Sequence, residues 1–134
     1  MGMDFEYLIK QHNLKVTPQR LSILTSMHKY GHIGIDDLYI EVRKYFSTIS
    51  LATLYKNINL MLKNSLITEV KIPSIKSKYE IKKEAHAHVF CTVCKEFEDV
   101  AFDYKSIITK VEKNTAYKVD ASEFVFSGIC QNCQ

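Results

Sequence analysis

Four cysteines stand in two identical C-x2-C pairs, Cys91 with Cys94 and Cys130 with Cys133, and the chain has no other cysteine. Such a pair brings two thiolates onto one tight turn at the separation that tetrahedral Zn²⁺ requires, and two pairs complete a closed site. The spacing predicts a structural zinc that ties the end of the chain to the start of its second half. A thiol-disulfide oxidoreductase is the alternative, but the usual βαβ context is missing.

His86 and His88 precede the first pair with one residue between them. Residues i and i+2 of an extended chain point to the same side, so both imidazoles can reach one ion. An H-x-H pattern alone is a weak metal signal. His12 and His28 are interpreted as structural. A hydrolytic metalloenzyme is not expected, since no H-E-x-x-H motif is present.

The 134 residues form one domain or two very small ones, and a domain of about 50 residues usually needs a metal or a partner. No apolar run approaches a membrane span, and nothing resembles a secretion signal. We therefore expect a cytoplasmic protein without membrane contact. Residues 1–82 carry 12 basic and 7 acidic side chains, whereas 83–134 carry 6 and 8. This asymmetry fits a first half on DNA.

Apolar spacing predicts four helices in the first half, followed by a hairpin. The first helix ends near Asn13, and the second begins at Pro18 with Thr17 as its cap and is broken by residues 30–34. The third covers about 36–45, and the fourth follows Ser50. Strands are expected at 66–72 and 77–81 around a turn at 73–76, then at 88–91, 96–102 and 117–126, with a helix at 104–114. The order indicates an α+β chain: a winged helix-turn-helix over 1–82 and a small α/β domain with a four-cysteine zinc site over 83–134.

Over roughly residues 14–133 the chain resembles the ferric uptake regulator family. The resemblance is carried by KVTPQR at 15–20, His32, DDLY at 36–39, SLATLYKN at 50–57, Tyr79–Glu80, the two histidines, both cysteine pairs and Gly128. It implies a homodimeric repressor in which 1–82 binds DNA and 83–134 is the dimerisation and metal-binding domain. It also implies a structural zinc and a regulatory metal between the domains, where a hinge near 82–85 couples metal binding to DNA binding. Carried over by position, the regulatory ligands are His32, Glu80, His86, His88 and Asp99, a set suited to Fe²⁺ or Mn²⁺.

The branch of the family is harder to choose. Asp99 matches peroxide sensors, where iron sensors have Glu. At the position of Glu80, however, the peroxide sensors compared carry Asp, which favours an iron sensor. Many iron sensors have a third metal site, built from an acidic residue between the two histidines and a later histidine. Here the first position is Ala87 and residues 120–123 contain no histidine, so this site is not expected. Lys95 replaces the usual glycine after the second cysteine. We favour a peroxide sensor in which Fe²⁺ and H₂O₂ convert His32 or His86 to 2-oxo-histidine. The alternatives are an iron-responsive repressor, then zinc and nickel sensors.

The fourth helix is expected to enter the major groove of DNA. Its polar residues can contact bases and phosphates, and basic residues of the first half and the wing can contact the backbone. The predicted DNA-contacting residues are Lys15, Arg20, Ser50, Thr53, Tyr55, Lys56, Asn57, Lys76 and Lys78. A dimer predicts an AT-rich inverted repeat. The rival from another class is a zinc-ribbon protein-interaction adaptor, whose behaviour on DNA would be independent of metal and unaffected by changes at His86.

Overall fold

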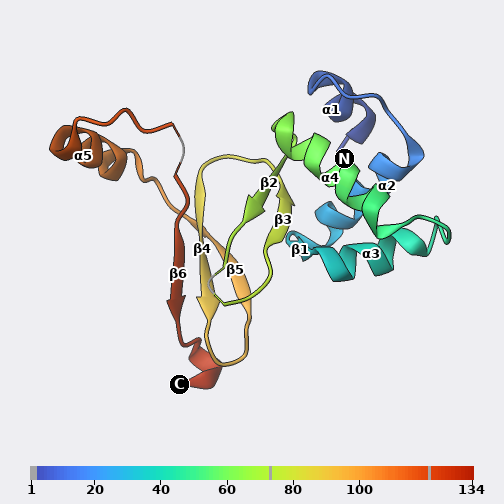
Figure 1. Ribbon diagram of the computed structural model, residues 1–134. Helices are drawn as coiled ribbons and strands as arrows, with labels where there is room; N and C mark the ends of the chain where they lie inside the picture. The colour runs from blue at the N-terminus through green and yellow to red at the C-terminus, as the bar shows by residue number, and fades with distance from the viewer. Residues whose placement is uncertain (1–2, 73, 121) are drawn as a thin grey trace. The chain divides into compact units, whose positions relative to one another are not determined.

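The computed structural model describes residues 3–72, 74–120 and 122–134 and divides them into two compact units, Met1–Lys82 and Lys83–Gln134. Each unit mixes helices with a three-stranded sheet, so the α+β prediction is confirmed (Figure 1). Within the described residues no helix is both long enough and apolar enough to cross a membrane.

The first unit contains four helices, α1 (Phe5–Gln11), α2 (Pro18–Tyr30), α3 (Ile35–Arg43) and α4 (Leu51–Lys63). Helices α2 and α4 begin where a hydroxyl caps a free backbone N–H. The Thr17 Oγ1 accepts from Arg20 N at 3.2 Å, and the Ser50 Oγ accepts from Thr53 N at 3.1 Å. A single apolar core, which includes Leu24, Leu38 and Ile58, joins the helices to the sheet.

The sheet of the first unit has the order β1-β3-β2, from β1 (Ile33–Gly34), β2 (Ile67–Val70) and β3 (Lys78–Ile81), all antiparallel. Strands β2 and β3 form the hairpin expected as the wing, and the winged helix-turn-helix prediction is confirmed. Strand β1 was not predicted, because two residues are too few for an alternation of apolar and polar side chains. Pro73 of the expected turn lies outside the described residues.

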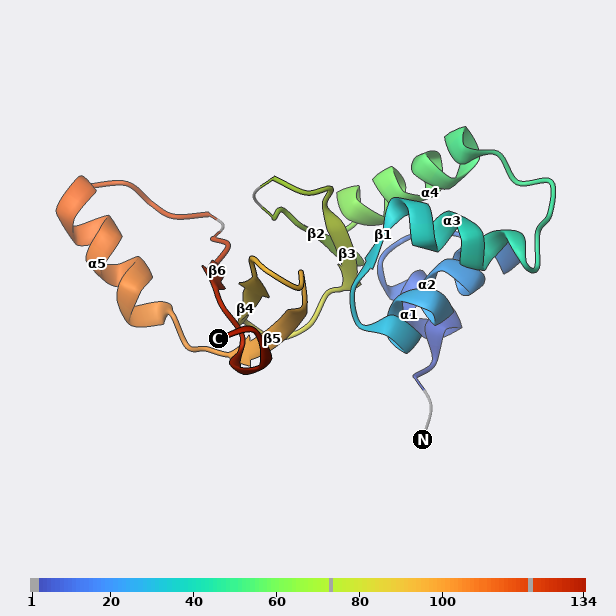
Figure 2. The ribbon, with the colours of Figure 1, turned by 90° about the horizontal axis from the view of Figure 1, so that it is seen from below.

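The second unit has a sheet of order β5-β4-β6, built from β4 (His86–Cys91), β5 (Phe97–Ala101) and β6 (Val125–Gly128). Strand β4 pairs antiparallel with β5 and parallel with β6. Helix α5 (Lys105–Thr115) stands clear of this sheet in both views (Figures 1 and 2), and a 3₁₀ turn, η1 (Gln131–Cys133), closes the chain.

The strand expected over 117–126 is wrong for most of its length. Among its described residues only Val125 and Phe126 lie in a strand, and Ala121 lies outside the described part of the chain. The reason is local: Ala116 ends α5 in the left-handed region at φ 59°, and the Val119 N–H then donates to the Glu112 carboxylate at 3.0 Å. That backbone donor is therefore bonded to a helix side chain rather than to a neighbouring strand.

Candidate functional site

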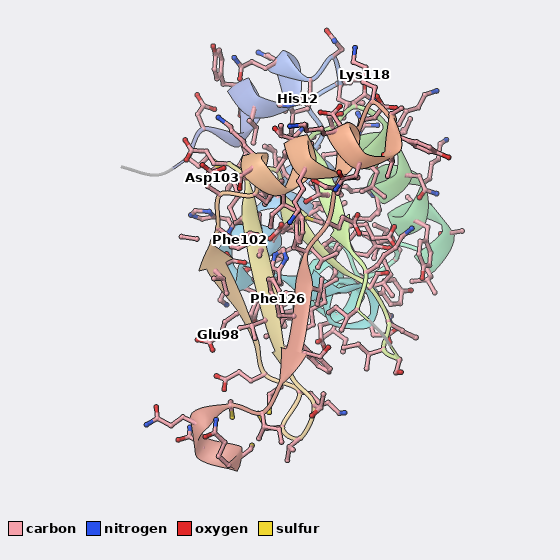
Figure 3. All side chains as sticks on the ribbon, turned by 90° about the vertical axis from the view of Figure 1, so that its left-hand side faces the viewer. His12, Glu98, Phe102, Asp103, Lys118 and Phe126 are labelled. Atoms are coloured by element: carbon pink, nitrogen blue, oxygen red, sulfur yellow. The ribbon has the colours of Figure 1, made fainter. Side chains whose placement is uncertain are left out.

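The four cysteines meet at one end of the second unit. Their Sγ atoms all lie within 4.8 Å of one another, and Figure 3 shows sulfur atoms gathered beside η1. Tetrahedral zinc with bonds of about 2.3 Å requires sulfur atoms about 3.8 Å apart. Cys94 Sγ and Cys130 Sγ are 3.8 Å apart, and all four thiols are free of disulfides. The donor set therefore fits Zn²⁺, as the spacing predicted.

Backbone donors prepare one of these thiols as a thiolate. The N–H groups of Cys130 and Cys94 point at Cys91 Sγ at 3.4 and 3.5 Å and hold the pKa of Cys91 at about 6. The side-chain contact with Cys130, followed by burial, raises the pKa of Cys133 to about 12. Four crowded thiols resist losing all their protons together. A divalent cation bound among them would supply the positive charge that allows all four thiols to deprotonate.

Lys95 closes the first cysteine turn in the left-handed region, at φ 68°, and its N–H donates to Cys91 O at 3.0 Å. A glycine would adopt this conformation without steric cost. Lys95 adopts it at a steric cost, and the four cysteines still come together. Its ammonium donates to Thr92 O at 2.8 Å and lies over the Phe90 ring.

A second donor cluster lies on one face of the β4–β5 pair. Residues 86 and 88 share a face of β4, and the register places Asp99 of β5 directly opposite His88. Asp99 Oδ1 is 3.2 Å from His88 Nε2 and 3.8 Å from His86 Nε2, and the two imidazole nitrogens are 3.0 Å apart. A point equidistant from these three atoms lies about 2 Å from each, the usual length of a metal–ligand bond.

Neighbouring groups orient both imidazoles. The carbonyl of Glu84 can only accept, so its 2.7 Å contact fixes the proton of His86 on Nδ1 and leaves the Nε2 lone pair for a metal. Phe97 stacks on the His88 ring with centroids 4.9 Å apart and planes 19° from parallel. Sequence reasoning missed this role of Phe97, although its place two residues before Asp99 on an expected strand could have suggested a shared face.

His32 and Glu80 form a pair within the first unit. Gly31 ends α2 at φ 75°, and the chain then enters β1, where Ile33 pairs with Tyr79. One residue further along this register His32 lies across from Glu80, with Nε2 to Oε2 at 3.1 Å. Glu80 is buried and also accepts from Thr68 Oγ1 at 3.5 Å. A carboxylate held beside an imidazole is a ready pair of metal donors.

Helix α4 buries one stripe and exposes another. Leu54, Ile58 and Met61 are fully buried, whereas the opposite stripe is open to solvent and consists of Leu51, Ala52, Tyr55, Lys56 and Asn59. The contacts predicted from the sequence did not include the exposed Ala52 and Asn59. The helical period counted from Tyr55 would have found them.

Asn57 does not lie on the exposed stripe. It is buried, its Oδ1 accepts from Arg20 Nε at 3.1 Å and its Nδ2 donates to Thr53 O at 3.2 Å. Arg20 also donates to Lys15 O at 2.7 Å. These bonds tie α4 to the start of α2.

The remaining predicted contacts differ in exposure. Lys15 and Ser50 are exposed, and Thr53 and Lys78 are half-buried. Lys76 is exposed and pairs with Asp36 at 2.9 Å, a contact that solvent screens. His12 Nδ1 donates to Leu8 O at 2.8 Å, and His28 packs against Phe5, as their structural interpretation expected.

Residues 11–127 match the model of the ferric uptake regulator family. The chain belongs to this family. It is therefore one of a family of metal-responsive transcription regulators, whose members are named for different signals. The resemblance seen in the sequence is confirmed.

Relatives of this family member carry both peroxide and iron names. The Bacillus subtilis peroxide operon regulator is 25% identical over 127 residues, covering 93% of this chain and 88% of its own length. The ferric uptake regulation protein of the same organism is also 25% identical, over 126 residues, covering 89% and 85%. The solved structure of the Campylobacter jejuni peroxide stress regulator is 35% identical, covers 98% of this chain and 100% of that chain, and has a TM-score of 0.75.

Proposed function

We propose that this protein is a DNA-binding repressor that senses peroxide through ferrous iron. The observation that carries the proposal is the trio of His86, His88 and Asp99 on one face of β4 and β5. Two histidines and one carboxylate leave open coordination positions and are typical of non-haem iron sites that react with oxygen species.

Each unit alone holds an incomplete ligand set, with three donors in the second unit and the His32–Glu80 pair in the first. We infer from the family resemblance that one Fe²⁺ or Mn²⁺ takes all five. An ion that binds donors of both units restricts how the units are arranged, and metal binding is then coupled to DNA binding.

Ferrous iron, when bound, would activate the O–O bond of H₂O₂ for cleavage with no net change in its own oxidation state. The chain contributes the target, an imidazole of His32 or His86 held beside the reacting peroxide. In the net change one oxygen atom of H₂O₂ is added to that ring as 2-oxo-histidine, the other leaves as water, and two electrons pass from imidazole to peroxide. The modified ring is a poorer ligand, so the repressor leaves DNA. Each protein is consumed once, which distinguishes this sensor from an enzyme.

Two observations favour peroxide over iron sensing. Asp99 matches the family's peroxide sensors, and the 35% identity to the Campylobacter jejuni peroxide stress regulator extends over nearly the whole chain. Glu80 and the equal similarity to an iron regulator favour the alternative, an iron-responsive repressor of iron uptake.

We further propose that the four-cysteine cluster binds a structural Zn²⁺. The second unit buries few large apolar residues, so a metal crosslink supplies stability that its core lacks. Four reduced thiols suit the cytoplasm, where we place the protein.

Helix α4 is proposed to bind the major groove through its exposed stripe, with Tyr55 and Lys56 at its centre and Ser50 and Thr53 at its start. Lys15, Lys76 and Lys78 would contact phosphates. For Arg20 and Asn57 the observed bonds support a different role: they position α4, and Asn57 reaches a base only if those bonds break.

A homodimer on an AT-rich inverted repeat is the proposed assembly. Helix α5 buries none of its residues, and its Ile107 and Val111 are exposed. Phe102, Phe124 and Phe126 gather with Tyr104, and Phe102 and Phe126, labelled in Figure 3, have ring centroids 5.8 Å apart. An apolar helix face and a partly exposed aromatic group are typical of a surface covered by a second copy.

The test of this function is operator binding, followed by fluorescence anisotropy without oxygen, for Fe²⁺-loaded and Mn²⁺-loaded protein. We expect both forms to bind, and dilute H₂O₂ to release the iron form alone, without recovery on adding fresh Fe²⁺. Release by iron chelation with insensitivity to H₂O₂ would instead support the iron-responsive alternative. Equal binding with and without metal would support an adaptor.

A further inference from the structure

The two carboxylate oxygens of Asp99 face different kinds of group. Oδ1 faces the Nε2 atoms of His88 and His86, whereas Oδ2 is bonded to the ammonium of Lys83. Lys83 and Asp99 both belong to the second unit, so this contact is internal to it. Lys83 is also the first residue of that unit, in the short segment before β4.

We propose that Lys83 tunes the regulatory site by sharing Asp99 with the metal. This inference rests on the proposed function, because it takes the ligand set from there. Lys83 keeps Oδ2 out of the coordination sphere, so Asp99 offers the metal only Oδ1. It also places a fixed positive charge beside a site that must accept a dication.

Elementary electrostatics gives the direction of the effect. A lysine ammonium next to a ligand carboxylate cancels part of the negative charge that attracts the metal, and it repels the metal directly. The Lys83 side chain is about half exposed, at 47%, so solvent and salt weaken the repulsion without removing it. Lys83 therefore lowers the affinity of the site for divalent ions, so that half of the sites are filled only at a higher metal concentration.

The chain offers a matched control in Lys82, the neighbouring exposed lysine. Lys83→Met and Lys82→Met remove the same charge from adjacent positions, but only the first removes the contact with Asp99. Lys83→Arg keeps the charge and the contact. The experiment is calorimetric titration of the zinc-loaded full chain with Mn²⁺, at low and high salt, for these variants and Asp99→Asn.

We expect Lys83→Met to tighten Mn²⁺ binding by roughly tenfold at low salt and by less at high salt. Lys82→Met and Lys83→Arg should stay within about twofold of the parent chain. Asp99→Asn should weaken binding. The proposal is overturned if Asp99→Asn weakens binding while Lys83→Met leaves it unchanged or weaker. If Asp99→Asn has no effect, the regulatory ligand set itself is wrong and the role of Lys83 is lost with it.

Discussion

At the scale of single residues, Lys95 shows how a chain can keep a site while straining its turn. The family's usual glycine would take the left-handed conformation freely, but Lys95 holds it at φ 68° with a Cβ in place. Two contacts offset part of the cost, one to Thr92 O and one to the Phe90 ring.

Lys95→Gly is expected to stabilise the second unit by about 0.5–1 kcal/mol. Relief of the left-handed strain stabilises the folded state, and the greater freedom of the unfolded chain offsets only part of that gain. Urea unfolding of the zinc-loaded protein, followed by circular dichroism, measures this change. Lys95→Ala is the control: it keeps the Cβ, loses both ammonium contacts and should not be more stable than the parent. A stabilised alanine variant with an unchanged glycine variant would contradict the strain argument.

Replacement of Cys133 tests whether the fold of the second unit depends on zinc bound by four thiolates. Cys133→Ser leaves three thiolates, so we expect zinc content to fall close to zero and the amide protons of β4 and β6 to exchange rapidly, while α2 to α4 stay protected. Elemental analysis and hydrogen exchange measure both. Val93→Ser is the control, because this exposed residue lies within the other cysteine pair and its side chain is not a ligand. Full zinc content in the Cys133 variant would rule out the four-thiolate site.

At the scale of elements, helix α4 has its proposed DNA-contacting stripe on one side and its buried, packed stripe on the other. Tyr55 is 39% exposed on the open stripe, whereas Asn57 is buried against α2. We expect Tyr55→Ala to cost about 1–3 kcal/mol of operator binding with an unchanged melting temperature. Tyr45→Ala, at an even more exposed tyrosine outside α4, should leave affinity unaltered. Equal affinity of both variants in an anisotropy titration would remove Tyr55 from the interface.

Much of the element order was predictable because each signal was local. Thr17-Pro18 and Ser50 begin helices with caps that the sequence displays, and the H-x-H and C-x2-C patterns place donors on one face or one turn. The rest depends on contacts between distant residues. The Arg20–Asn57 bond spans 37 positions, and β1 is too short to show a pattern. Asp99 could be assigned from the family, but only the β4–β5 register shows it opposite His88.

At the scale of the whole molecule, the proposed homodimer rests on the exposed apolar surface of the second unit. Val111→Glu puts a charge on the exposed apolar face of α5 and is expected to raise the dimer dissociation constant about 30-fold or more, since burying an unpaired charge costs about 2 kcal/mol or more. Sedimentation at several concentrations measures it. Lys113→Glu, on the same helix, should leave the dimer intact. A dimer unaffected by Val111→Glu would move the interface away from α5.

In the proposed function, peroxide oxidises His32 or His86 through bound iron. The most direct measurement is peptide mass spectrometry on Fe²⁺-loaded and Mn²⁺-loaded protein after brief exposure to dilute H₂O₂. We predict the gain of one oxygen atom at His32 or His86 in the iron-loaded sample only, with His12, His28 and all four cysteines unmodified. Unmodified His32 and His86 in iron-loaded protein that binds its operator would contradict the claim, and the iron-responsive alternative would replace it.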